Sequence, residues 1–404
     1  MTSQDIYGWV KDLPIVDWHN HLDPKALQED APFGSLYEVW VKPDPYKHRA
    51  MRICGVPERL ITGDAPESEK MAAWESTLPK LVGNPLFAWA QMELDFLKAH
   101  PLETLTPLKL LKLFNVAYAS PCMTAEELGR RASPPGAMQT GPTGVSPVGA
   151  RDTPWIIPSL RMNAGDVVAL DVLERFAAAG CRVVDVSVDD AAKLEENFES
   201  LSVVAGFAAA HGWTMLLHLG ALRETSDRLR RATGPAGGFA GMRVPVDPGL
   251  VARFLDRLEG SGADGQDARR PSGGRASGLP RTVLMTLNPE AHAQLAVLAG
   301  SFVEDGVSGK VQLGPAWWWC DHREGIFDVF EKTAAYGVLS TFIGMTTDSR
   351  SLLSFVRHDY FRRLLARWMA QKAAAGDFPD DESLLRPICE NICYRNAAER
   401  VALG

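Results

Sequence analysis

Several features that define other classes of protein are missing from this sequence of 404 residues. No run of Lys and Arg offsets the formal net charge of −8, so nucleic acid and anionic membranes are not expected as partners. The chain contains no apolar stretch of the roughly 18 residues that a membrane-spanning helix requires. Its first residues lack the basic start and apolar run of a signal peptide. We therefore predict a cytoplasmic protein without a membrane segment.

Two kinds of cofactor site are missing as well. No Gly-rich phosphate-binding loop stands between a strand and a helix, so nothing indicates a nucleotide cofactor. None of the six cysteines forms a CxxC pair. Cys389 and Cys393 lie four residues apart and would share one face of a helix, either as a metal or redox pair or as buried thiols in a reducing cytosol. The remaining clues to function are histidines, carboxylates and arginines.

The apolar residues indicate one large α/β unit. Hydrophobic residues make up 46% of the chain, and short β-branched or apolar runs alternate with helix-like stretches. The predicted strands cover residues 14–22, 115–120, 154–161, 181–188, 214–220, 282–288, 310–318 and 342–349. Eight strands that alternate with helices predict an α/β fold of the (β/α)8 TIM-barrel type, with the barrel formed by residues 1–22 and 114–404.

Three segments interrupt this alternation. Residues 23–113 are too long for a single crossover and are rich in Trp, Leu and helix formers. We expect them to form a helical insertion after the first strand, covering the barrel mouth. Residues 133–150 and 260–278 are rich in Gly, Pro and Ser and lack periodicity, which predicts mobile loops.

The first predicted strand ends in Asp17-Trp18-His19-Asn20-His21, the strongest local motif of the chain. Side chains alternate along a strand, so His19 and His21 project from the same face, toward the barrel interior. Two imidazoles placed in this way can bind one divalent metal, although a pair of polar histidines without a metal fits the same pattern. Their position favours a metal, because the active sites of such barrels lie at the carboxyl ends of the strands.

Two further residues occupy equivalent positions. His218 ends the fifth predicted strand, and Asp348 ends the eighth. Alone, such a histidine is usually a core or surface residue, and an aspartate before serine is usually a helix cap. Metal ligands are favoured because all these strand ends converge on one mouth. A His-x-His pair with a fifth-strand His and an eighth-strand Asp resembles the metal site of the amidohydrolase superfamily.

Residues missing from this pattern indicate one metal rather than two. Two-metal members of the superfamily place a bridging Lys on the fourth strand, but here none occurs before Lys193. Hydrolytic members commonly carry a His on the sixth strand, and here none occurs before His292. The pattern therefore points to a single metal and away from an ordinary hydrolase.

Arginines are the second recurring feature of the strand ends. Those at or just after a predicted strand are Arg161, Arg223, Arg350 and Arg357. Guanidinium groups bind carboxylates through two parallel hydrogen bonds, so several at one mouth indicate an anionic substrate; solvated residues at helix starts are the alternative. Trp317 and Trp318, with the tryptophan after them, either wall a sugar pocket or pack against helices.

With these residues in place, the sequence resembles the uronate isomerase (glucuronate isomerase) family. The segments that carry the resemblance run in family order over nearly the whole chain and include DWHNHLDPKALQED, DPYKHRAMRICGV, PKLVGNPLFAWAQMEL, PSLRMNAGD, LHLGALRETSDRLRRATGPAGGF, KVQLGPAWWWCD and GMTTDSRSLLSFVRHDYFRRLL. The resemblance implies one divalent metal, usually zinc, held by His19, His21 and Asp348, with His218 near it. It also implies substrate contacts at Tyr46, Arg161 and Arg350.

The sequence departs from the family at two places. Pro45 stands where the family has a pocket histidine, and SPCMTAEEL replaces a segment with paired aspartates and a proline. Neither departure touches the implied metal ligands. Both leave the choice of substrate open.

The implied reaction interconverts an aldose and a ketose: D-glucuronate and D-fructuronate, or D-galacturonate and D-tagaturonate. It needs acid/base groups, stabilisation of an enediolate and a clamp on the substrate. Asp348 can bind the metal and also shuttle a hydroxyl proton. Tyr46, or water at the metal, is the candidate for proton transfer between C1 and C2, and Arg350 could lower the pKa of the phenol and stabilise the enediolate. Arg161 and Arg357 are candidates for binding the C6 carboxylate.

Two other functions remain open at this point. One is a hydrolase or deaminase of the same superfamily, which would release ammonia or cleave an amide. The other is a diverged family member that acts on another sugar acid or only binds one. In each case the expected partner is a small molecule, and assembly into a homo-oligomer is compatible with the sequence.

Overall fold

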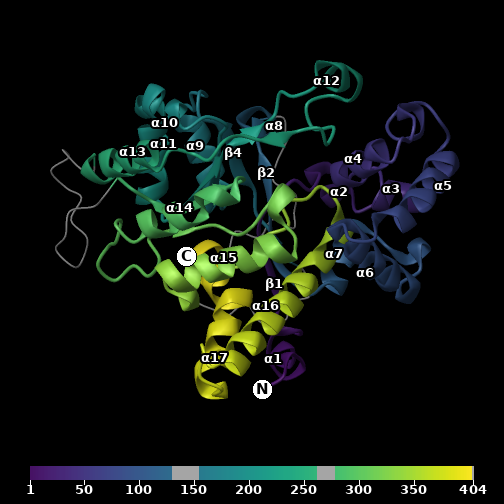
Figure 1. The fold of residues 1–404 in the computed structure, drawn as a ribbon. Helices are drawn as coiled ribbons and strands as arrows, with labels where there is room; N and C mark the ends of the chain where they lie inside the picture. Colours follow the sequence, from purple (N-terminus) through teal and green to yellow (C-terminus); the bar gives the residue numbers. More distant parts are fainter. Residues whose placement is uncertain (130–153, 262–277, 403–404) are drawn as a thin grey trace.

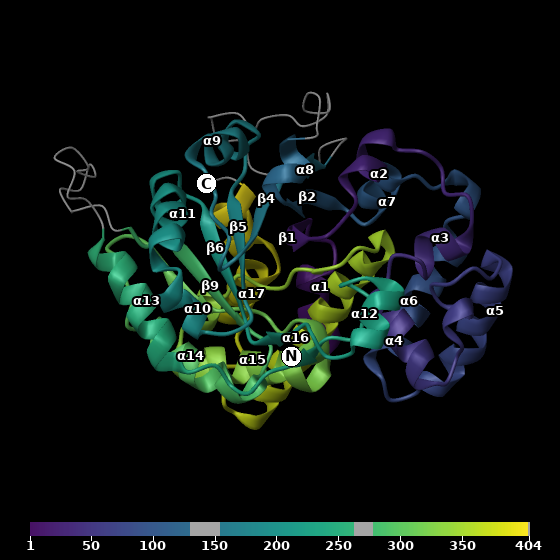
Figure 2. The ribbon, with the colours of Figure 1, turned by 90° about the horizontal axis from the view of Figure 1, so that it is seen from above.

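The computed structural model describes residues 1–129, 154–261 and 278–402. The loop predicted at 133–150 lies outside these described residues, and so does most of the loop predicted at 260–278. Within the described part, parallel strands joined by helices form one curled sheet (Figures 1 and 2). The predicted α/β class is confirmed.

The strands follow one another in sequence order around the sheet. Its path is β1-β2-β4-β5-β6-β9-β10, all neighbours are parallel, and the short β3 pairs with β2. Their bounds are β1 Ile15–Asn20, β2 Val116–Met123, β3 Trp155–Ile156, β4 Ser159–Asn163, β5 Val183–Val188, β6 Thr214–Leu219, β9 Arg281–Thr286 and β10 Val311–Leu313. β5 and β6 are buried throughout, which explains their nearly continuous apolar sequences. Asp185 and His218 are the ionisable residues that interrupt them.

The eighth predicted strand, 342–349, is not a strand of the sheet. The segment is buried and runs beside β1, where the Asp348 amide donates to the His19 carbonyl oxygen at 3.2 Å. On its other side, the Ile343 amide donates to Oε1 of Gln312 in β10 at 2.9 Å. Only part of a backbone ladder joins the segment to β1, side-chain hydrogen bonds supply other contacts, and Asp348 leaves the extended conformation with a φ of 46°. The described sheet has seven strands along its path, with β3 beside β2, so the prediction of a strand at 342–349 is wrong.

Helices alternate with the strands and cover the outside of the sheet (Figure 2). Their bounds are α8 Ala125–Gly129, α9 Leu170–Ala178, α10 Ala192–Glu196, α11 Phe198–Ala210, α13 Pro248–Gly260, α14 His292–Ala299, α15 Arg323–Tyr336 and α16 Val356–Ala375, with α1 Ser3–Val10 and α17 Glu382–Glu390 beside α16. α13 begins for a local reason: Pro248 opens the helix and the Asp247 carboxylate accepts from the Gly249 amide at 2.8 Å. Its Phe254 and Leu255 then face the core.

Shorter helical turns connect these elements. The 3₁₀ turns are η1 Glu58–Leu60, η2 Leu78–Leu81, η3 Leu102–Thr104, η4 Pro289–Ala291, η5 Trp318–Cys320, η6 Leu339–Thr341 and η7 Leu352–Phe355, and the π turns are η8 Asn391–Arg395 and η9 Ala398–Ala402. Cys389 is buried and Cys393 partly so, and neither belongs to a candidate metal-binding group among the described residues. Buried thiols are therefore the favoured interpretation of that pair.

A series of helices separates β1 from β2. They are α2 Pro24–Glu29, α3 Leu36–Trp40, α4 Pro45–Ile53, α5 Glu67–Thr77, α6 Pro85–Ala99 and α7 Pro107–Leu113, and we call residues 24–113 the helical segment. Four of them begin with proline after a capping Asp, Asn or Thr, a strong start signal. They pack around a core cluster that contains Trp40, Trp74 and Trp89 and extends to residues of β1, β2 and η7. In Figures 1 and 2 these helices lie together on one side of the sheet.

The chain between β6 and α13 forms an arm, residues 221–242. Its base is an antiparallel pair of short strands, β7 Ala221–Leu222 and β8 Gly241–Met242, and it carries helix α12, Asp227–Thr233. In both ribbon views α12 lies toward the helical segment, near α4 (Figures 1 and 2). The arm therefore spans from the sheet to the helices that follow β1.

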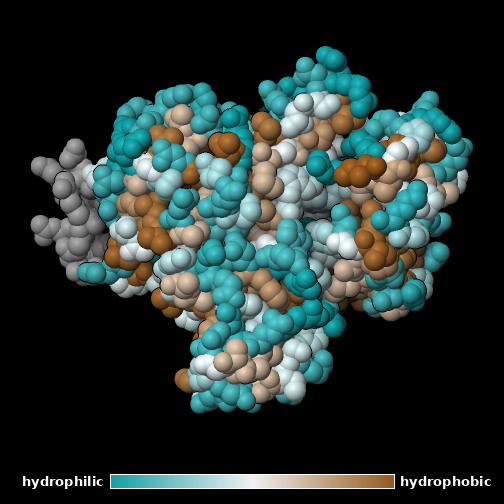
Figure 3. Space-filling view, in the orientation of Figure 1, coloured by the Kyte–Doolittle hydropathy of each residue, from teal (hydrophilic) through white to brown (hydrophobic). Residues whose placement is uncertain are grey.

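Polar residues cover most of the visible surface, and apolar residues gather in smaller patches, several of them over the helical segment (Figure 3). Of the helices that the structure describes, none has the length and apolar character to cross a membrane.

Candidate active site

A cavity of about 670 Å³ opens where the sheet, the helical segment and the arm meet. It lies toward the carboxyl ends of the strands, where a barrel of this class places its active site. Its lining includes nearly all the residues selected from the sequence: His19, His21, Tyr46, Arg161, His218, Trp317, Trp318, Asp348 and Arg350. Arg357 is not among the described residues that line it.

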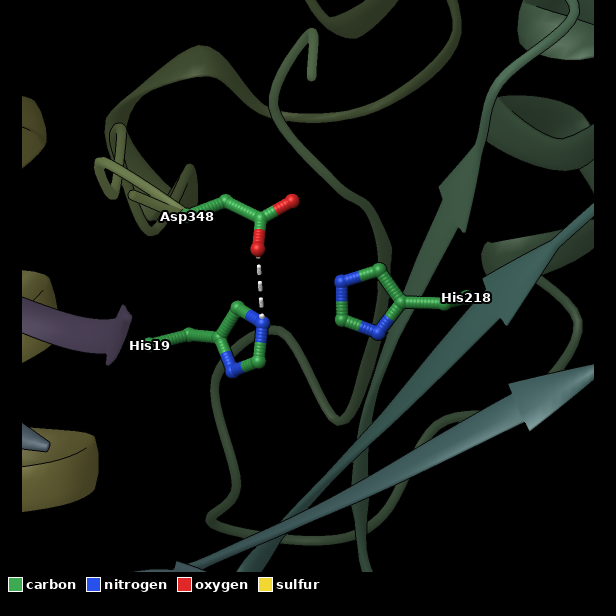
Figure 4. A group of neighbouring side chains, drawn as sticks. All are labelled: His19, His218 and Asp348. Atoms are coloured by element: carbon green, nitrogen blue, oxygen red, sulfur yellow. Dashed lines mark ion pairs between the residues drawn. The ribbon is translucent and has the colours of Figure 1, made fainter. Parts of the chain in front are cut away.

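His19 of β1, His21 directly after it and Asp348 of the 342–349 segment lie together in the wall of this cavity. Nε2 of His19 lies 3.2 Å from Oδ1 of Asp348, and Nε2 of His21 lies 3.0 Å from the same oxygen. His218, from β6, faces the same space (Figure 4). One ligand atom from each of His19, His218 and Asp348 falls within 4.8 Å of the others. The alternation of side chains along β1 has therefore brought both imidazoles to one carboxylate, as predicted.

Asp185 on β5 completes the cluster, and it was not among the residues predicted from sequence. Its Oδ1 lies 2.7 Å from Nδ1 of His218, its Oδ2 lies 3.9 Å from Nε2 of His19, and Arg161 forms an ion pair with it. Burial alone would raise the pKa of Asp185, but the charges of Arg161, His218 and His19 hold it well below its usual value. The available signal was an acid inside a fully buried strand, VVDVSV.

Cys122, near the end of β2, is a second residue that the sequence did not single out. Its Sγ lies 2.9 Å from Nδ1 of His21, so the imidazole has the thiol on one side and Asp348 on the other. Burial lowers the pKa of His21 to about 4, which keeps its ring neutral at neutral pH. A neutral imidazole is the form that binds metals, and a hydrogen bond to its other nitrogen fixes which nitrogen faces the ion.

The cluster fits a divalent cation. Three of its buried polar atoms have neither a hydrogen-bond nor an ion-pair partner within the described part of the chain: Nδ1 of His19, Nε2 of His218 and Oδ2 of Asp348. Buried polar atoms are normally hydrogen-bonded, so a convergent group without partners needs another source of attraction. The atoms are imidazole nitrogens and carboxylate oxygens, which are the usual donors to zinc.

A network around Asp17 holds the 342–349 segment against β1. The buried carboxylate of Asp17 accepts from the Thr347 amide (2.6 Å), the Thr347 hydroxyl (2.8 Å) and the Thr346 hydroxyl (3.0 Å), and it lies 3.1 Å from Nε2 of His358. Burial opposes its charge, but His358 and the hydrogen bonds from Thr347 lower its pKa below the usual value. Asp348 follows directly in the left-handed region, a strained position that such surroundings can sustain.

The arginines divide into two groups. Arg161 and Arg350 line the cavity, as does Arg223, which donates to Ser187 at 2.7 Å and lies 5.0 Å from the Trp318 ring. Arg357 is buried elsewhere: it forms an ion pair with Asp321, donates to the Thr347 carbonyl oxygen at 2.7 Å and lies over the Trp89 ring. Its guanidinium supports the segment before Asp348 instead of facing the cavity.

Tyr46 reaches the cavity from the first turn of α4. Its ring packs edge-on against Trp319 and Trp89, at centroid distances of 5.4 and 6.4 Å. Burial, and then the charge of Asp348, raise the pKa of the phenol, and the charges of Arg357 and Arg350 only partly offset this. Arg350 lowers this pKa, as expected, but burial and the charge of Asp348 outweigh it. The phenol keeps its proton at neutral pH and can act as a donor.

The tryptophans form the part of the cavity wall beside His218. Trp317 packs edge-on against His218 with 4.7 Å between ring centroids, and Trp318 lies 4.9 Å from Trp317. Both line the cavity.

Fold and site together define a class: an α/β protein with a candidate metal centre and several arginines at the carboxyl ends of a curled parallel sheet.

Comparison with known proteins narrows that class. The model of the glucuronate isomerase family matches residues 1–110 and 180–400. A uronate isomerase of Caldicellulosiruptor bescii is 32% identical over 98% of this chain and 96% of its own length. One of Halalkalibacterium halodurans is 33% identical over 97% of this chain and 94% of its own. The chain belongs to the glucuronate isomerase family, and the resemblance inferred from its motifs is confirmed.

Solved structures agree on the fold. A uronate isomerase of Thermotoga maritima superposes with a TM-score of 0.78 at 23% identity, covering 98% of this chain and 96% of the other. A glucuronate isomerase of Caulobacter crescentus also gives 0.78, at 19% identity, covering 98% and 93%. At these identities the likeness shows a shared fold.

Proposed function

We propose that the chain is an aldose–ketose isomerase of hexuronates, converting D-glucuronate to D-fructuronate, D-galacturonate to D-tagaturonate, or both. The observation that carries the proposal is the meeting of His19, His21 and Asp348 with Arg161 and Arg350 around one cavity. The names of its relatives support the same activity, since they are uronate isomerases over nearly the full length of this chain.

We further propose that the site holds one divalent metal, with zinc as the first candidate. His19, His21 and Asp348 would hold the ion, with His218 and Asp185 next to it. When bound, such an ion supplies positive charge that polarises the substrate oxygens. The unpartnered buried polar atoms of the cluster support this proposal.

The other residues fall into roles that the reaction requires. Conversion of an aldose to a ketose removes a proton from C2, adds one to C1 and moves a hydroxyl proton from O2 to O1. Asp348, whose Oδ2 has no hydrogen-bond partner among the described residues, would carry the hydroxyl proton. A water molecule in the cavity would accept the C2 proton, and Tyr46, which keeps its proton, would deliver its phenolic proton to C1 and regain one from that water. Arg350 would stabilise the enediolate charge.

The ends of the substrate would be held by groups that the cavity already presents. Arg161 would bind the C6 carboxylate, a role that we assign to it before Arg357 because Arg357 is engaged by Asp321. Trp317 and Trp318 would pack against the sugar, with its C–H groups on their rings.

The barrel is part of the proposal too. We propose that residues 1–22 and 114–404 form a (β/α)8 barrel in which the 342–349 segment takes the eighth position, and that residues 23–113 are an insertion over its mouth. The contacts of that segment with β1 and β10 support this arrangement. A cytoplasmic location and assembly into a homo-oligomer stay predictions.

Nuclear magnetic resonance of the metal-replete protein with each uronate tests the proposed function. We expect ketose to form without added nicotinamide or phosphate donor, and in deuterated water the product should carry deuterium at C1. Full retention of the substrate hydrogen would favour a hydride shift or a shielded base. Conversion of neither uronate would contradict the isomerase and favour a diverged member that acts on another sugar acid, while release of ammonia from an amine or amide substrate would indicate a deaminase or hydrolase.

A further inference from the structure

The arm touches α4 at the residue that precedes Tyr46. A Cβ atom placed on Gly238 would lie 2.2 Å from the carbonyl oxygen of Pro45, a distance that side chains do not tolerate. Gly238 also has a φ of +80°, which residues other than glycine rarely adopt. The backbone of the arm can therefore come this close to α4 only because position 238 is a glycine.

Two arginines of α4 also hold the arm, through hydrogen bonds to its backbone. Arg49 donates to the carbonyl oxygens of Gly238 (3.3 Å) and Ala240 (3.4 Å), and Arg52 donates to Gly237. The guanidinium of Arg49 also lies 4.4 Å from the Trp319 ring centroid. Because these donors come from successive turns of α4, they hold the arm along the helix as well as at its start.

This contact leads directly to Tyr46. Pro45 and Tyr46 open α4, so a shift of the Pro45 carbonyl moves the backbone that carries the phenol. Trp319, which Arg49 covers, packs edge-on against the Tyr46 ring at 5.4 Å. Gly238, Pro45 and Tyr46 all line the cavity, so the contact also forms part of its wall.

We infer that Gly238 is a positioning residue for the reaction: by seating the arm on the Pro45 carbonyl, it sets where the Tyr46 hydroxyl stands in the cavity. The inference rests on the proposed function, because it assumes that Tyr46 handles a proton. Its structural part, the coupling of the arm to the start of α4, is independent of any activity.

The test compares two neighbouring glycines of the arm. Gly238→Ala should push the arm and the start of α4 apart. Gly241→Ala is the matched control, since the nearest atom to its added Cβ lies 3.7 Å away, at ordinary contact distance. We expect kcat for the uronate to fall about 10- to 100-fold in Gly238→Ala with little change in KM, because a small misplacement of a catalytic group has effects of this size. Gly241→Ala should behave as the unmodified protein.

A double-mutant cycle shows whether Gly238 acts through Tyr46. If it does, Gly238→Ala adds little to the loss already caused by Tyr46→Phe. If the losses of kcat from Gly238→Ala and Tyr46→Phe multiply in the double variant, the inference is overturned. An unchanged kcat in Gly238→Ala would overturn it as well. If Gly238→Ala does not fold, Arg49→Met tests the same contact from α4, and it should show the same lack of additivity with Tyr46→Phe.

Hydrogen exchange separates this inference from the proposed function. In Gly238→Ala, amides of residues 45–53 and 221–242 should exchange faster than in the unmodified protein, and in Gly241→Ala they should not. Unchanged exchange at 45–53 would overturn the coupling even in an active enzyme. Faster exchange at 45–53 in a protein that converts neither uronate would keep the coupling and discard the proposed function.

Discussion

The two halves of the cavity are built in different ways. The half that carries His19, His21 and Asp348 is fixed by strand geometry and by the buried hydrogen bonds of Asp17. The half that carries Tyr46 lies on a helix, and side chains and the arm determine its place. The comparison indicates that strand geometry and backbone contacts beside β1 place the candidate metal ligands, whereas side-chain and arm contacts place Tyr46, the proposed proton donor.

A buried ion cluster anchors the helical half. The ammonium group of Lys47 lies 3.1 Å from Asp44 and 2.9 Å from Glu93, and it donates to the Trp40 carbonyl oxygen at 2.8 Å. Asp44 also caps α4 by accepting from the Tyr46 amide at 2.9 Å. Buried ion pairs cost desolvation energy, so their main use is to specify one arrangement. Here that arrangement is the start of α4.

Replacement of the shared ligand should have the largest effect on the first half. Asp348→Asn removes a charged ligand and a proton carrier together, so we expect the variant to fold but to lose most of its turnover and bind the metal far more weakly. Circular dichroism, kinetics and elemental analysis would check this. Full turnover in this variant would exclude Asp348 from the reaction.

Asp17→Asn and Glu93→Gln form a matched pair, since each neutralises a buried acid that holds one half in place. Asp17→Asn should lower the free energy of unfolding by about 3–5 kcal/mol, because it leaves a buried network without its charge. It should also weaken metal binding about 10- to 100-fold by loosening the segment that carries Asp348.

Glu93→Gln should lower the free energy of unfolding by less, about 1–3 kcal/mol, because Asp44 still pairs with Lys47. Metal affinity should stay unchanged while kcat falls, since Tyr46 is displaced and the ligands are not. Denaturant unfolding measures the free energy of unfolding, and competition with a chelator measures the metal affinity. If Asp17→Asn and Glu93→Gln weakened metal binding equally, the two halves of the cavity would not be held in place independently.

Arg350→Met tests a residue that lines the cavity without being a proposed ligand. We expect turnover to fall strongly, by about 100-fold as for other groups that stabilise developing charge. The metal content should stay at the level of the unmodified protein. A variant that loses its metal would instead give Arg350 a role in the metal-binding half.

Cys122→Ala should have a smaller effect, confined to the metal. It removes the Sγ atom that lies beside Nδ1 of His21, so the imidazole loses its orientation and affinity should fall about tenfold. Cys54→Ala, in the helical segment, is the control and should leave affinity unchanged. Equal affinities in both variants would show that the thiol does not orient His21.

The last expected effect appears only at acid pH and concerns the stability of the helical half. Burial lowers the pKa of His48 to about 4, below its ordinary value of 6.5. Between these values the unfolded chain binds a proton that the folded chain does not, so stability is full above pH 6.5 and is lost as the pH falls toward 4. The slope from this residue is at most about 1.4 kcal/mol per pH unit. Denaturant unfolding over that range should show a flatter dependence in His48→Gln.

Much of the metal-binding half could be predicted from the sequence, because strand periodicity places His19 and His21 on one face and the strand ends converge. Asp185 could not be selected in this way, since its role depends on its neighbours: it stands opposite Arg161 in the register of β4 and β5. The partners of the Arg357 side chain could not be predicted either, because a long side chain at a helix start can reach several groups.

The strand predicted at 342–349 failed for a related reason. Its apolar and β-branched residues are buried as those of a strand would be, but several of its amides donate to side chains, such as those of Gln312 and Asp17, instead of to a neighbouring strand. No local pattern shows that a segment will be held in this way. The contact of Gly238 with Pro45 could likewise not be predicted from the sequence, because it joins residues almost two hundred positions apart through backbone atoms.

Elemental analysis of the purified protein tests the central claim most directly, namely that His19, His21 and Asp348 form a centre for a single divalent ion. We expect close to one ion per chain and loss of that ion when His19 and His21 are both replaced by Ala, because two of its proposed ligands are then gone. Two ions per chain, or retention of the ion in the double variant, would contradict it.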